Sequence, residues 1–351
     1  MPRFKKLAIQ EIKKETGNSI SVVLNIPDDL TEEFKFIPGQ YITFRITLDG
    51  KEIRRSYSIC SSPESNELRV AIKEVENGLF SNYATKQLKE GDILEVSPPE
   101  GKFILQTATS HQRNYMAFTA GSGITPIMSM IKSVLFKETH STFVLIYGNK
   151  TAEETIFKAE IDDLLKQYPD RFFVTYVFSQ KILDDAILGR IDKSIVNLIL
   201  KNKFKNIDFY GYYLCGPETM IDVVTETLKE KGVSSSKIHF ELFTTIYPSG
   251  AITSKNLDGA TEITVILDDE ETTFEMSKKK FILTAALDEG LDAPYSCQGG
   301  ICSSCIGKVT EGNAVMDKNS ILSDEEIKEG IILTCQAHPT TEKITIDFDD
   351  V

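Results

Sequence analysis

Four cysteines near the C-terminus constrain this chain more than any other feature. Cys297, Cys302 and Cys305 are separated by four and then two residues, and Cys335 follows thirty residues later. The remaining two of the six cysteines, Cys60 and Cys215, lie far from this group. In a chain without secretory features, cysteines clustered in this way favour metal or cofactor ligation over disulfide bonds.

The spacing C-x4-C-x2-C with a distant fourth cysteine is typical of a [2Fe-2S] cluster, in which each iron takes two thiolates. Gly299 and Gly300 suit a tight loop whose backbone approaches the sulfides and donates hydrogen bonds to them. The alternatives are a zinc site or a set of buried thiols. Zinc sites favour paired C-x2-C knuckles, of which this chain has one, and its four histidines form no ligand group. We therefore predict four metal ligands: Cys297, Cys302, Cys305 and Cys335.

The bulk composition is that of an ordinary globular protein with two or three domains. The chain has 351 residues, of which 41% are hydrophobic and 26% charged. It contains no apolar run long enough to cross a membrane, and its first residues lack the apolar core of a signal peptide. We expect a cytoplasmic protein that binds neither membrane nor nucleic acid.

The net charge of −13 is concentrated in the last quarter of the chain. Residues 259–351 carry 19 acidic and 7 basic side chains, whereas the rest carries 33 acidic and 32 basic ones. This acidity can simply favour solubility. It also suits a docking surface for a basic electron-acceptor protein, because complementary fields accelerate encounter.

Three successive patterns predict a multidomain fold. Residues 1–107 alternate in period two over about six short segments, residues 41–48 among them, that are separated by turns. This pattern indicates an antiparallel β-barrel. Residues 108–246 alternate strands with helices, and helices are expected over residues 126–136 and 152–167 among others. This alternation indicates a doubly wound α/β domain with a parallel sheet. Residues 247–259 lack periodicity and resemble a linker, and residues 260–351 form a compact α+β module.

The cysteine segments resemble plant-type ferredoxins. Residues 293–309 are similar to the cluster loop of that family, and residues 333–339 are similar to its fourth-ligand segment. The resemblance implies a β-grasp fold for the C-terminal module. One departure is Gln298, where plant ferredoxins usually carry arginine.

The barrel contains a segment that resembles the R-x-Y-S flavin motif of the ferredoxin–NADP reductase superfamily. Residues 55–58 read Arg-Ser-Tyr-Ser and are expected at the start of a strand. Arg55 can neutralise a flavin phosphate, Tyr57 offers an aromatic face, and Ser58 can bond near the flavin N5. A charged edge strand with a tyrosine is the structural alternative.

A second segment supports the flavin prediction. Residues 78–81 resemble the superfamily's G-x-x-S phosphate segment, with Gly78 and Ser81 at the start of a short helix, where backbone N–H groups bind anions. The resemblance implies FAD, although related reductases with the same domain order bind FMN.

Residues 121–126 read Gly-Ser-Gly-Ile-Thr-Pro and resemble the superfamily's nucleotide loop, where small residues let the backbone approach a pyrophosphate. Residues 215–217 resemble its C-G-P motif, whose cysteine lies beside the nicotinamide; a buried thiol at a tight turn is the alternative. Residues 241–243 resemble an E-x-F segment near the flavin. The resemblance implies these nicotinamide-site residues: Gly121, Gly123, Thr125, Pro126, Cys215, Gly216, Pro217, Glu241 and Phe243.

The choice between NADPH and NADH depends on groups that meet the 2′-position of the adenosine ribose. Ser179, Gln180 and Lys181 follow the third strand of the α/β domain, where NADP-dependent relatives often show Ser-Arg, and Lys150 follows the second strand. No acidic residue stands in residues 179–181, so we favour NADPH, with NADH as the alternative.

The order of the three domains is similar to reductases that serve aromatic-ring oxygenases and phenylacetyl-CoA epoxidases. The resemblance implies an NAD(P)H-dependent oxidoreductase that passes electrons through FAD and a [2Fe-2S] cluster to an oxygenase, with Ser58, Cys215 and Glu241 at the catalytic centre. A second hypothesis is a general NADPH-dependent reductase of ferredoxins or haem proteins. A third hypothesis is a redox sensor without enzymatic activity.

Overall fold

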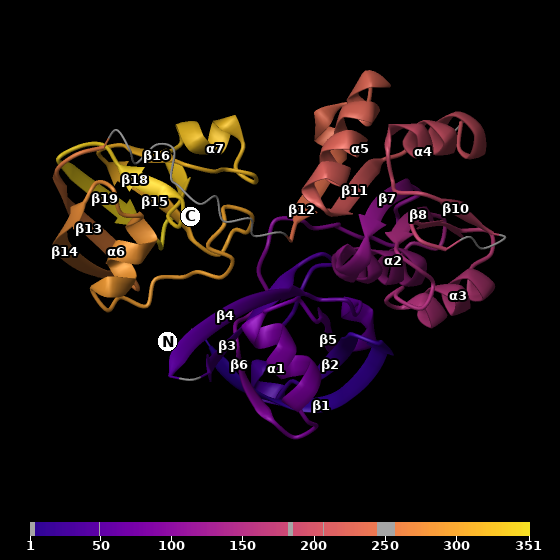
Figure 1. The fold of residues 1–351 in the computed structure, drawn as a ribbon, viewed down its shortest axis with the longest axis horizontal. Coiled ribbons are helices and arrows are strands. Elements are labelled where there is room, and N and C mark those ends of the chain that lie inside the picture. Colours follow the sequence, from indigo (N-terminus) through magenta and orange to yellow (C-terminus); the bar gives the residue numbers. More distant parts are fainter. Residues whose placement is uncertain (1–3, 49, 182–184, 206, 244–256) are drawn as a thin grey trace. The chain divides into compact units, whose positions relative to one another are not determined.

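The computed structural model describes residues 4–48, 50–181, 185–205, 207–243 and 257–351. By contacts, the chain divides into two compact units, residues 1–243 and 244–351. The first unit holds the barrel and the α/β domain, and the second holds the cysteine-rich module (Figure 1). Most of the predicted linker, residues 247–259, lies outside the described residues.

The N-terminal part is a six-stranded antiparallel sheet in the order β4-β3-β6-β1-β2-β5. A bridge between Ile59, just after β4, and Val70 on β5 links the two edge strands, so the sheet curls into a barrel, and α1 packs against it with one face exposed (Figure 1). Alternating apolar residues such as Leu7, Val22 and Phe44 fill its interior. The elements are β1 (Lys5–Thr16), β2 (Ser19–Asn25), β3 (Tyr41–Leu48), β4 (Lys51–Ser58), β5 (Leu68–Lys73), α1 (Leu79–Gln87) and β6 (Ile93–Val96).

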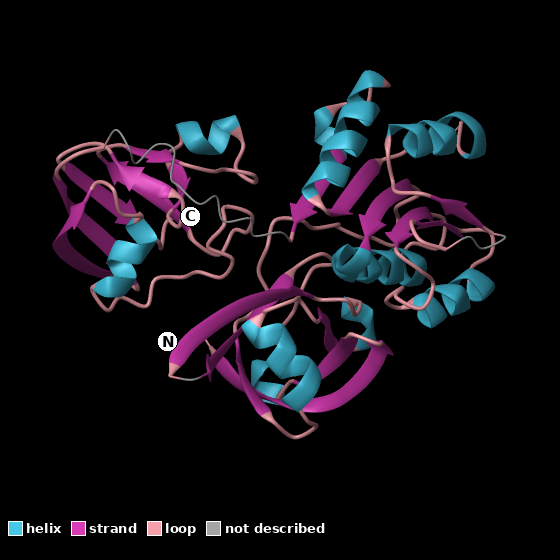
Figure 2. Cartoon of the chain, in the orientation of Figure 1, coloured by secondary structure: helices cyan, strands magenta, loops and turns pink. Residues whose placement is uncertain are grey.

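The α/β domain is a six-stranded parallel sheet in the order β10-β9-β8-β7-β11-β12. Helices α2 and α3 cover one face and α4 and α5 the other (Figure 2). The elements are β7 (Asn114–Ala120), α2 (Ile124–Lys137), β8 (Thr142–Asn149), α3 (Lys158–Gln167), β9 (Phe172–Phe178), β10 (Ala186–Leu188), α4 (Lys193–Leu198), β11 (Gly211–Gly216), α5 (Glu218–Glu230) and β12 (Ile238–Leu242).

The direction of winding reverses between β7 and β11. Ligands of doubly wound sheets bind in the crevice beyond the carboxyl ends of the strands at this reversal. Gly121 follows β7 and Gly216 ends β11, so the two predicted nucleotide motifs meet at that crevice.

The second unit is an α+β module whose five-stranded sheet has the order β14-β13-β19-β15-β17. Its central strands β13 and β19 are parallel, and a two-stranded ribbon of β16 and β18 lies beside them. The elements are β13 (Ala260–Leu267), β14 (Glu270–Ser277), α6 (Ile282–Asp288), β15 (Ile306–Glu311), β16 (Ala314–Met316), α7 (Asp324–Lys328), β17 (Ile331–Leu333), β18 (Ala337–Pro339) and β19 (Lys343–Asp347).

The predicted three-part fold is therefore confirmed, with two local corrections. Residues 55–58 end β4 and do not start a strand, because β4 pairs with β3 from Lys51 onward. The helix predicted over residues 152–167 begins only at Lys158. Turns closed by the Thr155 amide and hydroxyl occupy residues 151–155, and Phe157 then adopts a left-handed conformation (φ +60°).

Candidate functional site

The four cluster cysteines (Cys297, Cys302, Cys305 and Cys335) lie in mutual contact within the second unit. Cys297 exchanges side-chain hydrogen bonds with Cys302 and Cys335, and Cys335 bonds Cys305. These contacts lower the pKa of Cys297 and raise those of Cys302 and Cys335.

The cluster loop is tightly built. The Gly299 amide donates to Cys297 Sγ over 3.3 Å. Gly300 has φ +72°, and a Cβ there would lie 3.0 Å from both the Gln336 side chain and the Lys318 carbonyl oxygen. Gln336 Nε2 donates to the Gln298 carbonyl oxygen at 3.0 Å, which ties the loop to the fourth-ligand segment.

The donor set fits a two-iron cluster. Four thiols that pair with one another are the ligand chemistry of a [2Fe-2S] centre. Within the described ranges, no three His, Cys, Asp or Glu side chains are placed to hold a single metal ion.

The R-x-Y-S segment forms the end of β4. Arg55 is exposed, and its Nη1 donates to the Arg54 carbonyl oxygen at 2.6 Å. The Tyr57 ring lies 5.8 Å from that of Phe44 and 5.5 Å from that of Phe80 on α1. Burial raises the pKa of Tyr57, opposed by the nearby Arg55 charge, so the phenol stays neutral.

The G-x-x-S segment also fits an anion site. Gly78 is the N-cap of the nine-residue helix α1, and a Cβ there would lie 2.5 Å from Ser81 Oγ. Ser81 itself is buried and accepts a hydrogen bond from the Val75 amide at 3.2 Å. The serine thus shapes the loop, and the amides of the helix N-terminus are the groups in this segment suited to an anion.

A hollow of about 700 Å³ lies beside this helix. Its lining includes Leu48 of β3, Asn77 and Gly78 before α1, and Asn82 on α1, but none of Arg55, Tyr57 and Ser58. The hollow therefore meets only one of the two flavin motifs. Leu48, Asn77 and Asn82 carried no signal in the sequence, because they come together only when the barrel closes.

The nucleotide loop packs directly against the end of β11. Gly123 approaches so closely that a Cβ there would lie 2.2 Å from the Cys215 carbonyl oxygen, whereas a Cβ at Gly121 would meet nothing within 4 Å. Thr119 Oγ1 donates to the same Cys215 oxygen at 2.7 Å. Gly123 is thus required for packing, and Gly121 leaves open space for a ligand. Thr125 and Pro126 are buried in the first turn of α2.

The three predicted catalytic residues converge between the barrel and the α/β domain. Cys215 and Glu241 are register partners on β11 and β12, and Ser58 Oγ donates to Glu241 Oε2 at 3.3 Å. Burial raises the pKa of Glu241 to about 8, opposed by the Ser58 hydrogen bond. Burial, with the Glu241 charge, also raises the pKa of Cys215, which favours the protonated thiol. Phe243 follows β12 and is partly exposed.

The predicted 2′-phosphate residues follow neighbouring strands. The amides of Ser179 and Gln180 bond the carbonyls of Asn149 and Lys150, which joins the segments after β9 and β8. Lys181 Nζ lies 2.6 Å from Glu153 Oε1, and this hydrogen bond lowers the pKa of Glu153 to about 2. Sequence reasoning missed Glu153, because it lies 28 residues away from Lys181.

Comparisons with known proteins agree with this geometry. Residues 6–104 match the oxidoreductase FAD-binding domain, residues 118–226 the oxidoreductase NAD-binding domain, and residues 265–340 the 2Fe-2S iron-sulfur cluster binding domain. No helix in the described part of the chain has the length and apolar character to span a membrane.

Full-length relatives share all three domains. The chain is 36% identical to a subunit of the 1,2-phenylacetyl-CoA epoxidase of Escherichia coli K12, over 99% of each chain. It is 31% identical to the ferredoxin reductase component of 3-ketosteroid-9-alpha-monooxygenase of Rhodococcus rhodochrous, over 97% of this chain and 96% of the relative. The fold matches phthalate dioxygenase reductase with a TM-score of 0.59 and 23% identity, over 98% of both chains.

Matched domains over most of the sequence and relatives above 30% identity over its full length lead to one assignment. The chain belongs to the NAD(P)H-dependent flavin and iron–sulfur oxidoreductases of the ferredoxin–NADP reductase superfamily, with a C-terminal 2Fe-2S ferredoxin domain.

Proposed function

We propose that this oxidoreductase is the reductase component of an oxygenase system and delivers electrons from NADPH to an oxygenase that acts on aromatic, phenylacetyl-CoA-like compounds. The similarity to a phenylacetyl-CoA epoxidase component, over nearly the whole of both chains, carries this proposal. The alternative is a general NADPH-dependent reductase of ferredoxins or haem proteins.

The chemistry that the bound groups supply is a change from two-electron to one-electron transfer: nicotinamide gives hydride, and the flavin releases single electrons to the cluster. The chain's own residues bind and orient these groups. Arg55 and the N-terminus of α1 at Gly78 hold flavin phosphate, and Tyr57 presents its ring to the flavin. Cys297, Cys302, Cys305 and Cys335 hold the two irons.

On the nicotinamide side, the backbone from Gly121 to Gly123 binds the pyrophosphate, and Thr125 and Pro126 fix the first turn of α2 behind it. Cys215, Gly216 and Pro217 would border the nicotinamide, and Phe243 would lie nearby at the end of β12. Ser58 at the end of β4 would face the same region, because it contacts Glu241 of β12. The support is the contact of both motifs at the reversal of the sheet.

Glu241 holds a proton at neutral pH, since its pKa is raised to about 8. The Ser58 hydroxyl, which contacts the Glu241 carboxyl group, lies at the end of the flavin strand. This pair therefore keeps an exchangeable proton beside the redox centre without placing a negative charge there.

For the nucleotide, we propose NADPH, bound through its 2′-phosphate by Lys150, Ser179 and Lys181. Two lysines and a hydroxyl group at the ends of β8 and β9 supply the needed positive charge and donor. Glu153 opposes this assignment by pairing with Lys181, so NADH is the alternative donor.

The partner is an electron-acceptor protein that docks on the acidic C-terminal module. With 19 acidic and 7 basic residues over 259–351, that module attracts a basic surface. We also propose a cytoplasmic location, because reducing conditions keep the cysteine thiols available for iron. We propose domain boundaries at 1–107 for the barrel, 108–246 for the NAD(P) domain, 247–259 for the linker and 260–351 for the ferredoxin domain.

An anaerobic titration with NADPH and then NADH, followed by visible absorption, tests the electron path. Bleaching of flavin and cluster bands by NADPH at low concentration is expected, and bleaching by NADH alone would reverse the choice of donor. Oxygenase turnover with a phenylacetyl-CoA substrate then separates the two functions. If the reductase supports haem proteins or free ferredoxins equally well, the general reductase is correct.

A further inference from the structure

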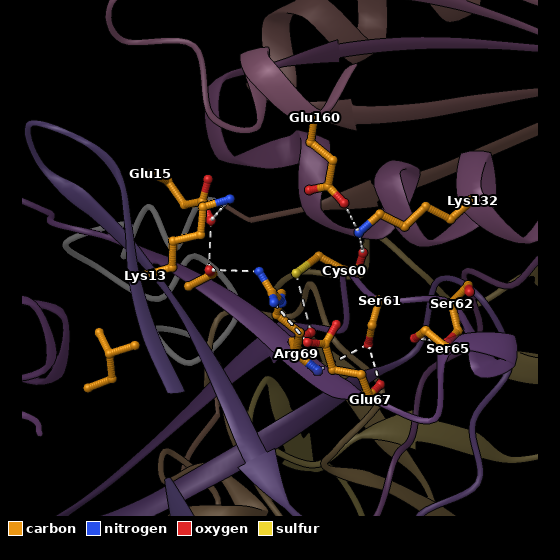
Figure 3. A network of polar contacts seen from close by, with 12 residues as sticks. Lys13, Glu15, Cys60, Ser61, Ser62, Ser65, Glu67, Arg69, Lys132 and Glu160 are labelled. Carbon is orange, nitrogen blue, oxygen red and sulfur yellow. Dashed lines mark hydrogen bonds and ion pairs between the residues drawn. The ribbon is translucent and has the colours of Figure 1, made fainter. Parts of the chain in front are cut away.

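A lysine is buried between the barrel and the α/β domain and has no role in the functions above. Lys132 lies in the middle of α2 and is only 8% exposed. Its Nζ lies 2.6 Å from Glu160 Oε1 on α3 and donates to the Cys60 carbonyl oxygen at 3.1 Å (Figure 3). Lysine side chains are almost never fully buried unless they are paired, and here both partners come from other segments of the fold.

The Cys60 carbonyl belongs to the segment that follows the R-x-Y-S strand. Cys60 is two residues beyond Ser58, and its amide and thiol both donate to the Arg69 carbonyl oxygen, at 2.8 and 3.3 Å. Ser129, one turn before Lys132 on α2, donates to the neighbouring Ser61 carbonyl oxygen at 2.6 Å. Two side chains of α2 therefore hold two successive peptide groups of the barrel.

The same helix begins at the nucleotide loop. Lys132 stands eight residues after Ile124, which corresponds to about 12 Å along the helix axis. Helix α2 thus carries the nucleotide loop at its start, and side chains at its centre hydrogen-bond the segment that follows the R-x-Y-S strand β4. Any change in these hydrogen bonds alters the separation of the two predicted ligand sites.

The electrostatics indicate a role beyond stability. The Lys132 side chain is 11% exposed and that of Glu160 is 31% exposed. An ion pair at such a site contributes little net stability, because desolvation offsets its attraction, and apolar residues of similar size often replace it without loss. Glu160 leaves Oε2 buried and without a hydrogen-bond partner among the described atoms, so the pair is not optimised for stability. What a methionine at position 132 could not supply is the directed bond to the Cys60 carbonyl.

We propose that Lys132 is a positioning residue for hydride transfer: its buried ammonium, charge-balanced by Glu160, sets the separation between flavin and nicotinamide through the Cys60 carbonyl. The inference rests on the proposed flavin and nucleotide sites. An error of about 1 Å in such a separation can lower the rate of hydride transfer about 100-fold, so loss of this single hydrogen bond should slow flavin reduction.

The test compares Lys132→Met, the double variant Lys132→Met/Glu160→Met and the control Lys137→Met in the full-length holoprotein. In Lys132→Met the Glu160 carboxylate loses its charged partner, and the double variant removes this unpaired carboxylate as well. Lys137 lies on the same helix and pairs with Glu64 of the barrel at 3.7 Å, but it is half-exposed, so its loss controls for a missing ion pair between the domains. Stopped-flow absorbance gives the limiting rate of flavin reduction and the nucleotide Kd, and thermal unfolding gives the Tm.

We expect the Lys132 variants to change the limiting rate of flavin reduction but not the nucleotide Kd. Both Lys132 variants should reduce flavin about tenfold or more slowly at saturating nucleotide, with Kd within about twofold of native and with full flavin content. The double variant should recover the Tm of the native protein but not its rate, and Lys137→Met should match the native protein in both.

Two results would overturn the proposal. One is a folded, flavin-loaded double variant that reduces at the native rate. The other is failure of the double variant to fold, which would make Lys132 a residue of stability. If the native protein is reduced by neither nucleotide, the proposed function fails first, and dithionite reduction of the bound flavin identifies that case.

Discussion

The contact between Gly123 and the end of β11 gives a prediction that can be worked from distances. In Gly123→Ala the new Cβ would lie 2.2 Å from the Cys215 carbonyl oxygen, 2.5 Å from its carbon and 2.9 Å from the Gly216 nitrogen. Ordinary contacts begin near 3.4 Å, so the start of α2 must retreat from β11 by roughly 1 Å. All three opposing atoms are backbone atoms, so no side-chain rotation can relieve the clash.

The strand cannot yield instead, because β11 is paired on both sides, with β7 and β12, and the Cys215 oxygen also accepts the Thr119 hydroxyl. Overpacking of this kind costs about 1–3 kcal/mol of stability. The nucleotide loop moves with the helix, so we expect flavin reduction to slow by about 100-fold as well.

Chemical denaturation measures the first effect, and stopped-flow flavin reduction at saturating nucleotide measures the second. Gly17→Ala is the matched control, since a Cβ at Gly17 meets nothing within 4 Å, and it should change stability by less than about 0.5 kcal/mol. A Gly123→Ala protein with native stability and a native reduction rate would refute the reasoning that this glycine is required for packing of the loop.

Three further predictions concern the other parts of the site. Cys297→Ser should abolish the cluster absorption and reduction of one-electron acceptors while flavin reduction by nucleotide persists; iron analysis checks it, and Cys60→Ser should retain the iron. Burial raises the pKa of Glu241 from 4.5 to about 8, so between those values the folded protein holds a proton that the unfolded chain lacks, and native stability falls as pH rises. The Glu241→Gln variant lacks this pH dependence, so the free energy of unfolding of the variant minus that of the native protein should rise by up to about 1.4 kcal/mol per pH unit between these pKa values. Chemical denaturation of both proteins at pH 5, 6.5 and 8 measures this difference, and a difference that does not change with pH would contradict the prediction. Glu153→Gln frees Lys181 and removes a negative charge, so the KM for NADPH should fall more than the KM for NADH, and equal changes would mean that neither residue meets the 2′-phosphate.

Local patterns in the sequence predicted much of the fold, because hydrophobic periodicity reports which face of an element is buried. The strand over residues 41–48 was predicted with its observed bounds, and α2 to within two residues at its start. The predictions failed where local and tertiary preferences differ. Residues 152–157 are compatible with helix, yet turns and a left-handed Phe157 occupy them. The short strand β10 exists only through its pairing with β9.

The sequence by itself determined the chemistry. The first three cluster cysteines, the R-x-Y-S segment and the G-x-G-I-T-P loop each carry their signal within a few residues, because each predicted site uses one loop or strand end. Only the tertiary structure decided which residues act together across long separations. Ser58 reaches Glu241 across 183 residues, Lys132 reaches Cys60 across 72, and Lys181 meets Glu153 across 28. Such contacts arise from sheet order and domain packing, which bring distant segments together without leaving any pattern in the local sequence.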